Sequence, residues 1–202
     1  MSDSRMPVRE AVAILRDARE PDDIVIPSMG SAREWMAAGP LHDLDFVLVP
    51  SAMGHATSVG LGLALARPDR RVIVLSGDGS LLMNPGSLVT ISAQGPGNLV
   101  IVVFVNGVYE VTGAQVTPRP RSHPVDYAAL ARASGITSVF RWSSLEDWRA
   151  GIASALGATG PTVVVLDVVP VPGAVGPRSP GPTGPRVERF MRAVQESRCQ
   201  AP

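Results

Sequence analysis

The sequence predicts an α/β fold with three layers, in which a mostly parallel sheet carries helices on both faces. Short apolar runs rich in β-branched residues alternate along the chain with segments whose apolar residues recur at helical spacing. The apolar runs are continuous rather than alternating, which is typical of strands covered on both faces. Regular alternation of strands and helices favours a parallel sheet, and folds of this class bind ligands beyond the carboxyl ends of their strands.

The chain of 202 residues is the size of one domain, and a stretch rich in proline and glycine divides it into three parts. Residues 1–170 form the predicted α/β domain. Residues 171–185 are rich in proline and glycine and are expected to form a tether, and residues 186–202 a short helix and tail. The predicted strands are 23–26, 46–49, 72–75, 99–105, 137–140 and 162–168. The predicted helices are 8–18, 32–38, 54–66, 80–94, 127–134 and 145–156.

The charged residues and the cysteine content exclude several classes of function. The formal net charge is zero, so a nucleic-acid or membrane surface is not indicated. The chain has no lysine, which excludes a Walker-type phosphate lysine and a pyridoxal Schiff base. Cys199 is the single cysteine, so there is neither an internal disulfide nor a thiolate metal cluster. We expect a cytoplasmic protein, because no apolar leader segment is present at the start.

A turn that suits a diphosphate follows the predicted strand 72–75. Its residues are Gly77, Asp78 and Gly79, and Ser80 suits the N-terminus of the next helix. Glycines allow a close backbone approach, and the free N–H groups of a helix N-terminus attract a phosphate. The carboxylate of Asp78 would repel that phosphate unless a cation lay between them. The turn therefore predicts a metal ion.

The second metal ligand is expected at the end of the neighbouring strand. Asn106 follows strand 99–105 and lies 28 residues after Asp78, the length that a helix and a return strand need. Because parallel strands end at one edge of a sheet, both side chains are predicted to meet there. Mg²⁺ prefers oxygen ligands of this kind, and the backbone carbonyl of Val108 is a candidate third ligand.

Three stretches of the chain carry a resemblance to a known family: SAMGHATSVGLGLALA, GDGSLLMNPGSLVTI and NGVYEVTGAQ. They are similar to the C-terminal cofactor-binding domain of thiamine-diphosphate-dependent decarboxylases, above all to sulfopyruvate decarboxylase beta subunits and phosphonopyruvate decarboxylases. The resemblance covers nearly the whole chain. It implies the fold of the diphosphate-binding domain, with thiamine diphosphate and Mg²⁺ as cofactors.

The resemblance also implies roles for particular residues. Asp78, Asn106 and the Val108 carbonyl would hold Mg²⁺, and Met53 would be the apolar residue over which the cofactor bends. The Gly30-Ser31 turn is shifted from the family's equivalent, which makes it a weaker candidate for diphosphate contact. The implied cofactor-binding residues are Ser51, Met53, Gly54, Gly77, Gly79, Ser80, Asn106 and Tyr109.

Two residues are candidates for catalysis by the same resemblance. His55 would lie beside the cofactor, although a purely structural, partly buried histidine is an equally open interpretation. Glu110 follows the metal turn and is placed near the mouth through which substrate enters. His42 is assigned no role.

The family activates its cofactor with a glutamate from a separate pyrimidine-binding domain, which this chain does not contain. The resemblance thus implies a pyrimidine-binding (alpha) partner subunit and a hetero-oligomer that removes CO₂ from a 2-oxoacid and releases an aldehyde. Sulfopyruvate and phosphonopyruvate are the expected substrates. The candidates for binding the sulfonate or phosphonate are Arg33, Arg119, Arg121 and His123, although loop arginines are more often only solvated.

Three other functions compete with this interpretation. An acetolactate-synthase-like carboligase subunit and a non-catalytic cofactor-binding or assembly subunit stay open. A dinucleotide-binding enzyme is disfavoured, because Gly60 and Gly62 fall inside a predicted helix rather than in the turn between strand and helix.

Overall fold

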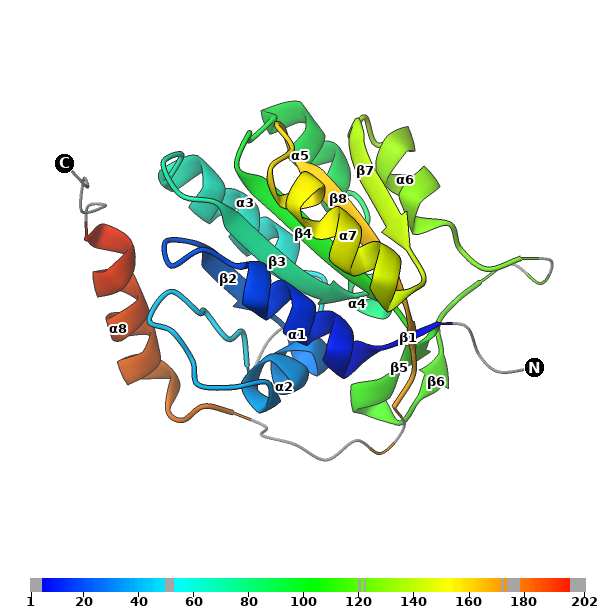
Figure 1. The fold of residues 1–202 in the computed structure, drawn as a ribbon, viewed down its shortest axis with the longest axis horizontal. Helices are drawn as coiled ribbons and strands as arrows, with labels where there is room; N and C mark the ends of the chain where they lie inside the picture. The colour runs from blue at the N-terminus through cyan, green and yellow to red at the C-terminus, as the bar shows by residue number, and fades with distance from the viewer. Residues whose placement is uncertain are drawn as a thin grey trace.

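The computed structural model of the chain describes residues 5–49, 53–119, 121, 123–171, 173 and 179–196 (Figure 1). No helix in these residues is long and apolar enough to cross a membrane. The described strands are β1 (Met6–Pro7), β2 (Ile24–Pro27), β3 (Val72–Gly77), β4 (Leu99–Val105), β5 (Val108–Tyr109), β6 (Gln115–Val116), β7 (Ser138–Trp142) and β8 (Thr162–Val169). The described helices are α1 (Val8–Ala18), α2 (Met29–Ala37), α3 (Ala56–Ala66), α4 (Asp78–Leu82), α5 (Ser87–Gln94), the 3₁₀ helix η1 (Glu110–Thr112), α6 (Tyr127–Ala133), α7 (Leu145–Leu156) and α8 (Thr183–Gln195).

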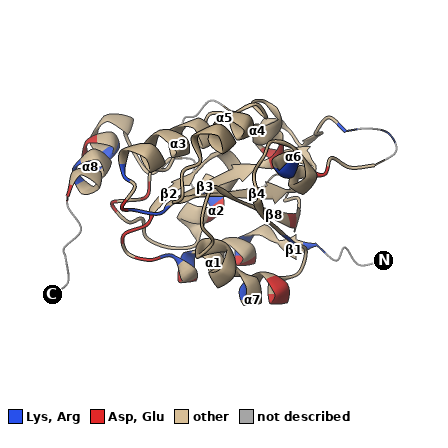
Figure 2. Cartoon of the chain, turned by 90° about the horizontal axis from the view of Figure 1, so that it is seen from above, with Lys and Arg blue, Asp and Glu red and all other residues tan. Residues whose placement is uncertain are grey.

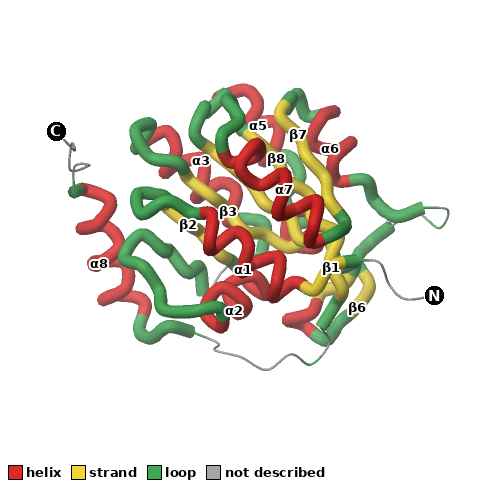
Figure 3. Tube along the Cα trace, viewed as in Figure 1, coloured by secondary structure: helices red, strands yellow, loops and turns green. Residues whose placement is uncertain are grey.

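The main sheet is parallel throughout its described pairs, as predicted. Figure 3 shows its strands in yellow between the red helices. Its order is β1-β8-β4-β3-β2, and β7 pairs with the same edge of β8 as β1. In the pair of β3 and β4, Val72 lies opposite Leu99 and Gly77 lies opposite Phe104. The two strands therefore end side by side, and the residues that follow them emerge at one edge of the sheet.

Helices cover both faces of the sheet and form the predicted three layers (Figure 2). Helices α1, α2 and α7 lie on one face, and α3, α5 and α6 lie on the other. Alternate strand residues point to opposite faces, so Ile73 and Leu75 join the first apolar cluster while Val72 and Val74 join the second. Burial on both faces explains the continuous apolar runs in the sequence.

The predicted strand 46–49 is wrong. Residues 45–48 form two isolated parallel bridges, Asp45 with Val25 and Leu48 with Ser28, and the N–H groups of Phe46 and Leu48 donate to the carbonyls of Val25 and Pro27, but no named strand forms. Two causes are visible. Strand β2 is only four residues long before the chain turns into α2, and the Val49 N–H donates to the Val47 carbonyl at 3.0 Å, which bends the segment away. Segment 43–49 is hereafter called the edge loop.

The predicted helix 80–94 is also wrong, because it is divided into α4 and α5. Pro85 and Gly86 lie at the break; proline offers no N–H to a preceding turn and its ring clashes with the carbonyl four residues earlier. Helix α4 begins at Asp78 with Gly77 as its N-cap, so Ser80 lies inside the helix and does not cap it. The break leaves a short helix whose first residue is the predicted metal ligand.

The C-terminal helix begins earlier than predicted. Helix α8 starts at Thr183, so residues 183–185 of the predicted tether are helical. Half of the remaining tether, residues 172 and 174–178, and also Cys199 lie outside the described residues. The hairpin of β5 and β6 and the short strand β1 were not predicted, because strands of two residues leave no periodic signal.

Candidate functional site

A cavity opens at the carboxyl edge of the sheet, where β3, β4 and β8 end. It is lined by the start of α2, by Met53, by the start of α4, by the turn that leads from β4 into η1, and by single residues of α1, β4 and β8. This is the position at which parallel α/β folds bind ligands. Its lining includes Met29, Gly30, Ser31, Arg33, Glu34, Met53, Gly77, Asp78, Gly79, Ser80, Asn106, Val108, Tyr109, Glu110 and Thr112.

Asp78 and Asn106 are brought together as predicted. Asp78 Oδ2 accepts the backbone N–H of Gly107 at 3.0 Å, which ties the first residue of α4 to the turn after β4. Gly107 has a φ of 78°, and this left-handed turn lets the Val108 N–H reach Asn106 Oδ1 at 2.9 Å. Both side-chain oxygens are thus fixed at the lining of one cavity.

Asp78 has the surroundings of a carboxylate that needs a cation. It is 1% exposed, and burial raises its pKa to about 6, although backbone N–H groups of Gly79 and Gly107 oppose the shift. No arginine contributes to that shift, and among the described residues no group of three or more His, Cys, Asp or Glu side chains could hold a metal ion. Buried carboxylates are normally paired or coordinate a metal. A cation shared by Asp78, Asn106 and a ligand's own oxygens fits this donor set.

Mg²⁺ binding is expected to weaken in acid because of Asp78. The carboxyl must be ionised to bind a metal, so below a pH of about 6 a proton competes with the ion. Apparent affinity should then fall by about tenfold per pH unit. Calorimetric titration of Mg²⁺ at saturating thiamine diphosphate checks this prediction between about pH 8 and about pH 5. The same titration without protein corrects for protonation of the cofactor. An affinity that is flat below a pH of about 6 would contradict it.

The loop that carries Met53 is anchored on α4. Ser80 Oγ accepts the N–H of Gly54 at 2.9 Å, and Asn84 Nδ2 donates to the Gly54 carbonyl at 3.1 Å. Gly54 has a φ of 85°, and a Cβ there would lie 3.0 Å from the Cβ of Asn84, so glycine is required. The hydroxyl of Ser80 thus positions the Met53 turn, a role that the sequence did not indicate.

Gly79 and Tyr109 pack against each other. A Cβ at Gly79 would lie 2.4 Å from the Tyr109 ring, a distance that no side chain tolerates. The glycine therefore allows the hairpin that begins at β5 to close over the start of α4. At Gly77 a Cβ would meet nothing within 4 Å, so the backbone there is open to a ligand in the cavity.

Glu110 lies in the cavity as predicted, but its carboxylate already has partners. Oε2 accepts a hydrogen bond from Arg33 Nη2 at 3.2 Å, and Oε1 accepts the N–H of Val171 at 2.7 Å. Arg33 Nε donates to Glu34 Oε1 at 2.8 Å, so this guanidinium lies between two carboxylates. Its charge is largely balanced within the chain.

Several predicted residues do not line the cavity. His55 is exposed, and its Nδ1 lies 3.2 Å from the Met53 carbonyl oxygen. Arg119, Arg121 and His123 are exposed on the loop that projects between β6 and α6 (Figure 1). Ser51 lies outside the described residues.

The Gly30-Ser31 turn does line the cavity. The hydroxyl of Ser31, however, is already bonded, since it donates to the carbonyl of Ser28 at 2.7 Å or to that of Leu75 at 2.9 Å. It also accepts the Ser28 N–H at 3.2 Å in a capping box of α2. At this turn, Ser31 Oγ is therefore a helix cap.

Two residues near the site were missed in the sequence. The Tyr127 hydroxyl is buried and has no hydrogen-bond partner among the described residues, and burial together with the charge of Asp78 raises the pKa of this tyrosine. Met29, in the cavity lining, has a φ of 54°, an uncommon and strained value for methionine. Neither has a local signal, because each depends on the tertiary position of a single side chain or peptide unit.

The carboxyl edge of this parallel sheet carries an acidic turn, a helix start bounded by glycines and an amide side chain. Together these features define a cofactor-binding domain. A scan against protein families matches residues 28–166 to the C-terminal TPP binding domain of thiamine pyrophosphate enzymes. The chain belongs to this thiamine pyrophosphate (thiamine diphosphate) enzyme family.

Individual relatives agree with the family match. Phosphonopyruvate decarboxylase of Streptomyces viridochromogenes is 43% identical over 149 residues, which are 74% of this chain and 36% of that protein. Sulfopyruvate decarboxylase subunit beta of Methanothermobacter thermautotrophicus is 41% identical over 152 residues, 74% of this chain and 75% of that subunit. A Mycobacterium smegmatis structure described as a thiamin diphosphate-dependent enzyme matches 82% of this chain and 32% of its own, with a TM-score of 0.66 and 22% identity, which supports the fold. The chain thus spans about a third of the phosphonopyruvate decarboxylase.

Proposed function

We propose that this chain is the thiamine-diphosphate- and Mg²⁺-binding (beta) subunit of a split 2-oxoacid decarboxylase. The observation that carries the proposal is the meeting of Asp78 and Asn106 at one cavity, in a chain that is 41% identical over 152 residues to a sulfopyruvate decarboxylase subunit beta. A separate pyrimidine-binding subunit would complete the enzyme, and sulfopyruvate or phosphonopyruvate would be the substrate.

The residues of the cavity have distinct parts in this proposal. Asp78, Asn106 and the Val108 carbonyl hold Mg²⁺ against the diphosphate, and the open backbone at Gly77 and the start of α4 offers N–H groups to it. When bound, thiamine diphosphate supplies the carbon nucleophile for the keto group of a 2-oxoacid and accepts the electrons left as CO₂ departs.

The anionic group of the substrate needs a cation, and the described residues leave none free in the cavity lining. Arg33 is the arginine of the cavity lining, and it already contacts Glu34 and Glu110. We propose that the sulfonate or phosphonate is bound chiefly by the partner subunit, and that the Arg33–Glu110 pair serves to shape the cavity. The exposed arginines of the loop after β6 lie outside the lining.

Met53→Ala is expected to slow turnover more than it weakens cofactor binding. Met53 presents an apolar side chain to the cavity, and its proposed role is to hold the cofactor in a reactive shape rather than to attach it. We expect kcat to fall on the order of tenfold or more, with a much smaller change in the Kd of thiamine diphosphate. Steady-state kinetics and calorimetric titration measure the two.

Met191→Ala is the matched control for Met53, because Met191 is 52% exposed on α8 and away from the cavity. It should change neither quantity. A Met53→Ala enzyme that loses affinity in proportion while retaining kcat would remove the proposed role of Met53.

The experiment that tests the proposed function is co-purification of the chain with its partner, followed by a screen of 2-oxoacids. Release of CO₂ and an aldehyde from sulfopyruvate or phosphonopyruvate is the expected result. Conversion of pyruvate to acetolactate would instead favour the carboligase. Cofactor binding without turnover of any 2-oxoacid would favour a non-catalytic assembly subunit.

A further inference from the structure

Helix α8 docks on the edge loop beside the sheet, although it lies outside the residues matched to the family (Figure 1). Phe190 is 6% exposed and stacks on Phe46 of the edge loop, with ring centroids 4.7 Å apart. At the far end of the helix, Arg70 Nη2 donates to the Glu196 carbonyl at 2.7 Å. Aromatic stacking at its middle and a hydrogen bond at its end hold α8 in one position.

Arg186, in the first turn of α8, binds the edge loop directly. Its Nη1 donates to the Val47 carbonyl at 2.7 Å, and its Nη2 donates to the Val49 carbonyl at 2.5 Å. Among the described residues the Val49 carbonyl has no backbone donor, while the Val47 carbonyl also accepts the Val49 N–H at 3.0 Å. A guanidinium is a rigid fork that can satisfy both at once, and bonds from a charged donor are stronger than neutral ones.

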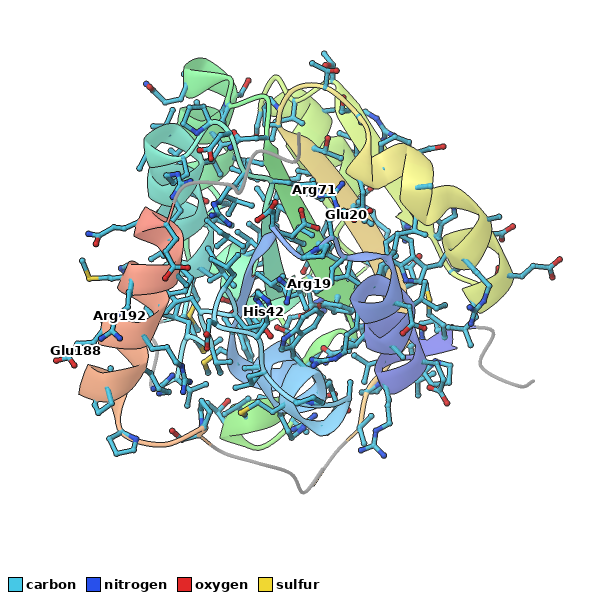
Figure 4. The ribbon with its side chains drawn as sticks, turned by 60° about the vertical axis from the view of Figure 1, so that its left-hand side comes forward. Arg19, Glu20, His42, Arg71, Glu188 and Arg192 are labelled. Atoms are coloured by element: carbon cyan, nitrogen blue, oxygen red, sulfur yellow. The ribbon has the colours of Figure 1, made fainter. Side chains whose placement is uncertain are left out.

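The opposite side of the edge loop is fixed to the body of the domain. Asp45 is buried, pairs with Arg19 at 2.6 Å and accepts the indole N–H of Trp35 at 2.9 Å. The backbone N–H of His42 also donates to Asp45 at 3.0 Å; Figure 4 labels Arg19 and His42 in this region. The edge loop is therefore held between the domain core and α8.

Three residues separate Val49 from Met53 in the sequence. Gly54, the next residue, is bound on both its N–H and its carbonyl by Ser80 and Asn84. The backbone is therefore bound by Arg186 at Val49, before Met53, and by α4 at Gly54, after Met53.

We propose that Arg186 is a positioning residue for the cofactor cavity: α8 returns across the domain so that this guanidinium fixes the edge loop and, through it, the segment that carries Met53. The role in cofactor binding rests on the proposed function. The attachment of the edge loop by α8 does not, and it can be measured in the free protein.

Hydrogen exchange of the full-length chain without cofactor tests the attachment. Arg186→Met keeps the length of the side chain but removes both donors, so the amides of Phe46, Leu48 and Gly54 should exchange faster, on the order of tenfold. Amides of β3 and β4 should keep their protection, which shows that the domain is folded. Arg192→Met is the matched control, because Arg192 is exposed on the same helix and points away from the domain in Figure 4.

Titration with thiamine diphosphate and Mg²⁺ tests the second step. Arg186→Met should raise the Kd on the order of three- to tenfold, since only the fraction of molecules with a correctly placed segment binds. Arg186→Lys, which cannot fork between two carbonyls, should restore only part of the affinity. Arg192→Met should match the unmodified chain.

If the amide exchange rates were unchanged in Arg186→Met while the unmodified chain bound the cofactor normally, the proposed attachment would be overturned. The proposed function would not be affected. Faster exchange without any change in Kd would overturn the link to the cavity. Absence of thiamine diphosphate binding even when the partner subunit is present would contradict the proposed function and, with it, the link to the cavity. The exchange result would still test the attachment.

Discussion

Asp78→Asn is expected to weaken Mg²⁺-dependent binding of thiamine diphosphate by at least about 100-fold, because it removes the one anionic side chain proposed as a ligand of the ion. The side chain keeps its shape, so its oxygen can still accept the Gly107 N–H. Binding should therefore be lost without loss of the fold. Calorimetric titration of the cofactor at fixed Mg²⁺ measures the effect.

The same substitution is expected to stabilise the free chain at neutral pH. Burial raises the pKa of Asp78 to about 6, so the native state favours the protonated carboxyl. The Asp78 carboxyl contributes fully to the free energy of unfolding at acid pH, and this contribution is lost as the pH rises through about 6. At pH 7 the free energy of unfolding is therefore lower by an amount on the order of 1–3 kcal/mol. Asparagine carries no charge and avoids that cost. Thermal unfolding at about pH 7 compares the two chains.

Asp69→Asn is the control for Asp78→Asn. Asp69 is half exposed and precedes β3, so it lies at the opposite end of the strand that leads to Asp78. Binding by this variant should equal that of the unmodified chain. Undiminished binding by Asp78→Asn would remove Asp78 from the metal site.

The chain by itself is expected to lack decarboxylase activity and to gain it when its partner is added. The proposed enzyme takes its activating acid from the partner subunit, and general acid–base groups of this kind contribute on the order of 10² to 10⁴ in rate. Turnover of sulfopyruvate or phosphonopyruvate should thus rise by at least about 100-fold on mixing. CO₂ release at increasing ratios of partner to chain measures the gain and its stoichiometry.

Mixing the partner with the Asp78→Asn chain controls for activity of the partner alone, and this mixture should stay inactive. Full turnover by the purified chain, unchanged by addition of the partner, would refute the division of the site between two subunits.

The layered fold and the meeting of Asp78 with Asn106 could be predicted because both follow from short-range rules. Apolar runs fix where buried strands lie, and parallel strands end at a common edge. The helix break at Pro85 could also be predicted, because proline removes a helical N–H. The apolar spacing on both sides of Pro85, however, favours one long helix. The edge loop was mistaken for a strand because its composition is β-like, while its pairing is limited by the short strand β2.

The contacts that shape the site could not be predicted from the sequence. Glu110 joins Arg33 to Val171, residues that are 77 and 61 positions away. Arg186 reaches Val47 across 139 positions, and nothing in either local sequence indicates the other. Such contacts depend on how the folded helices, strands and loops pack together, so hydrophobic periodicity and turn residues do not predict them.

A crystal structure of the chain grown with thiamine diphosphate and Mn²⁺ in place of Mg²⁺ tests the central claim most directly, because anomalous scattering locates the metal independently of the surrounding atoms. We predict one ion about 2 Å from oxygens of Asp78, Asn106 and the Val108 carbonyl, with diphosphate oxygens completing its coordination. An ion bound elsewhere, or a bound cofactor whose metal does not touch Asp78, would contradict the account.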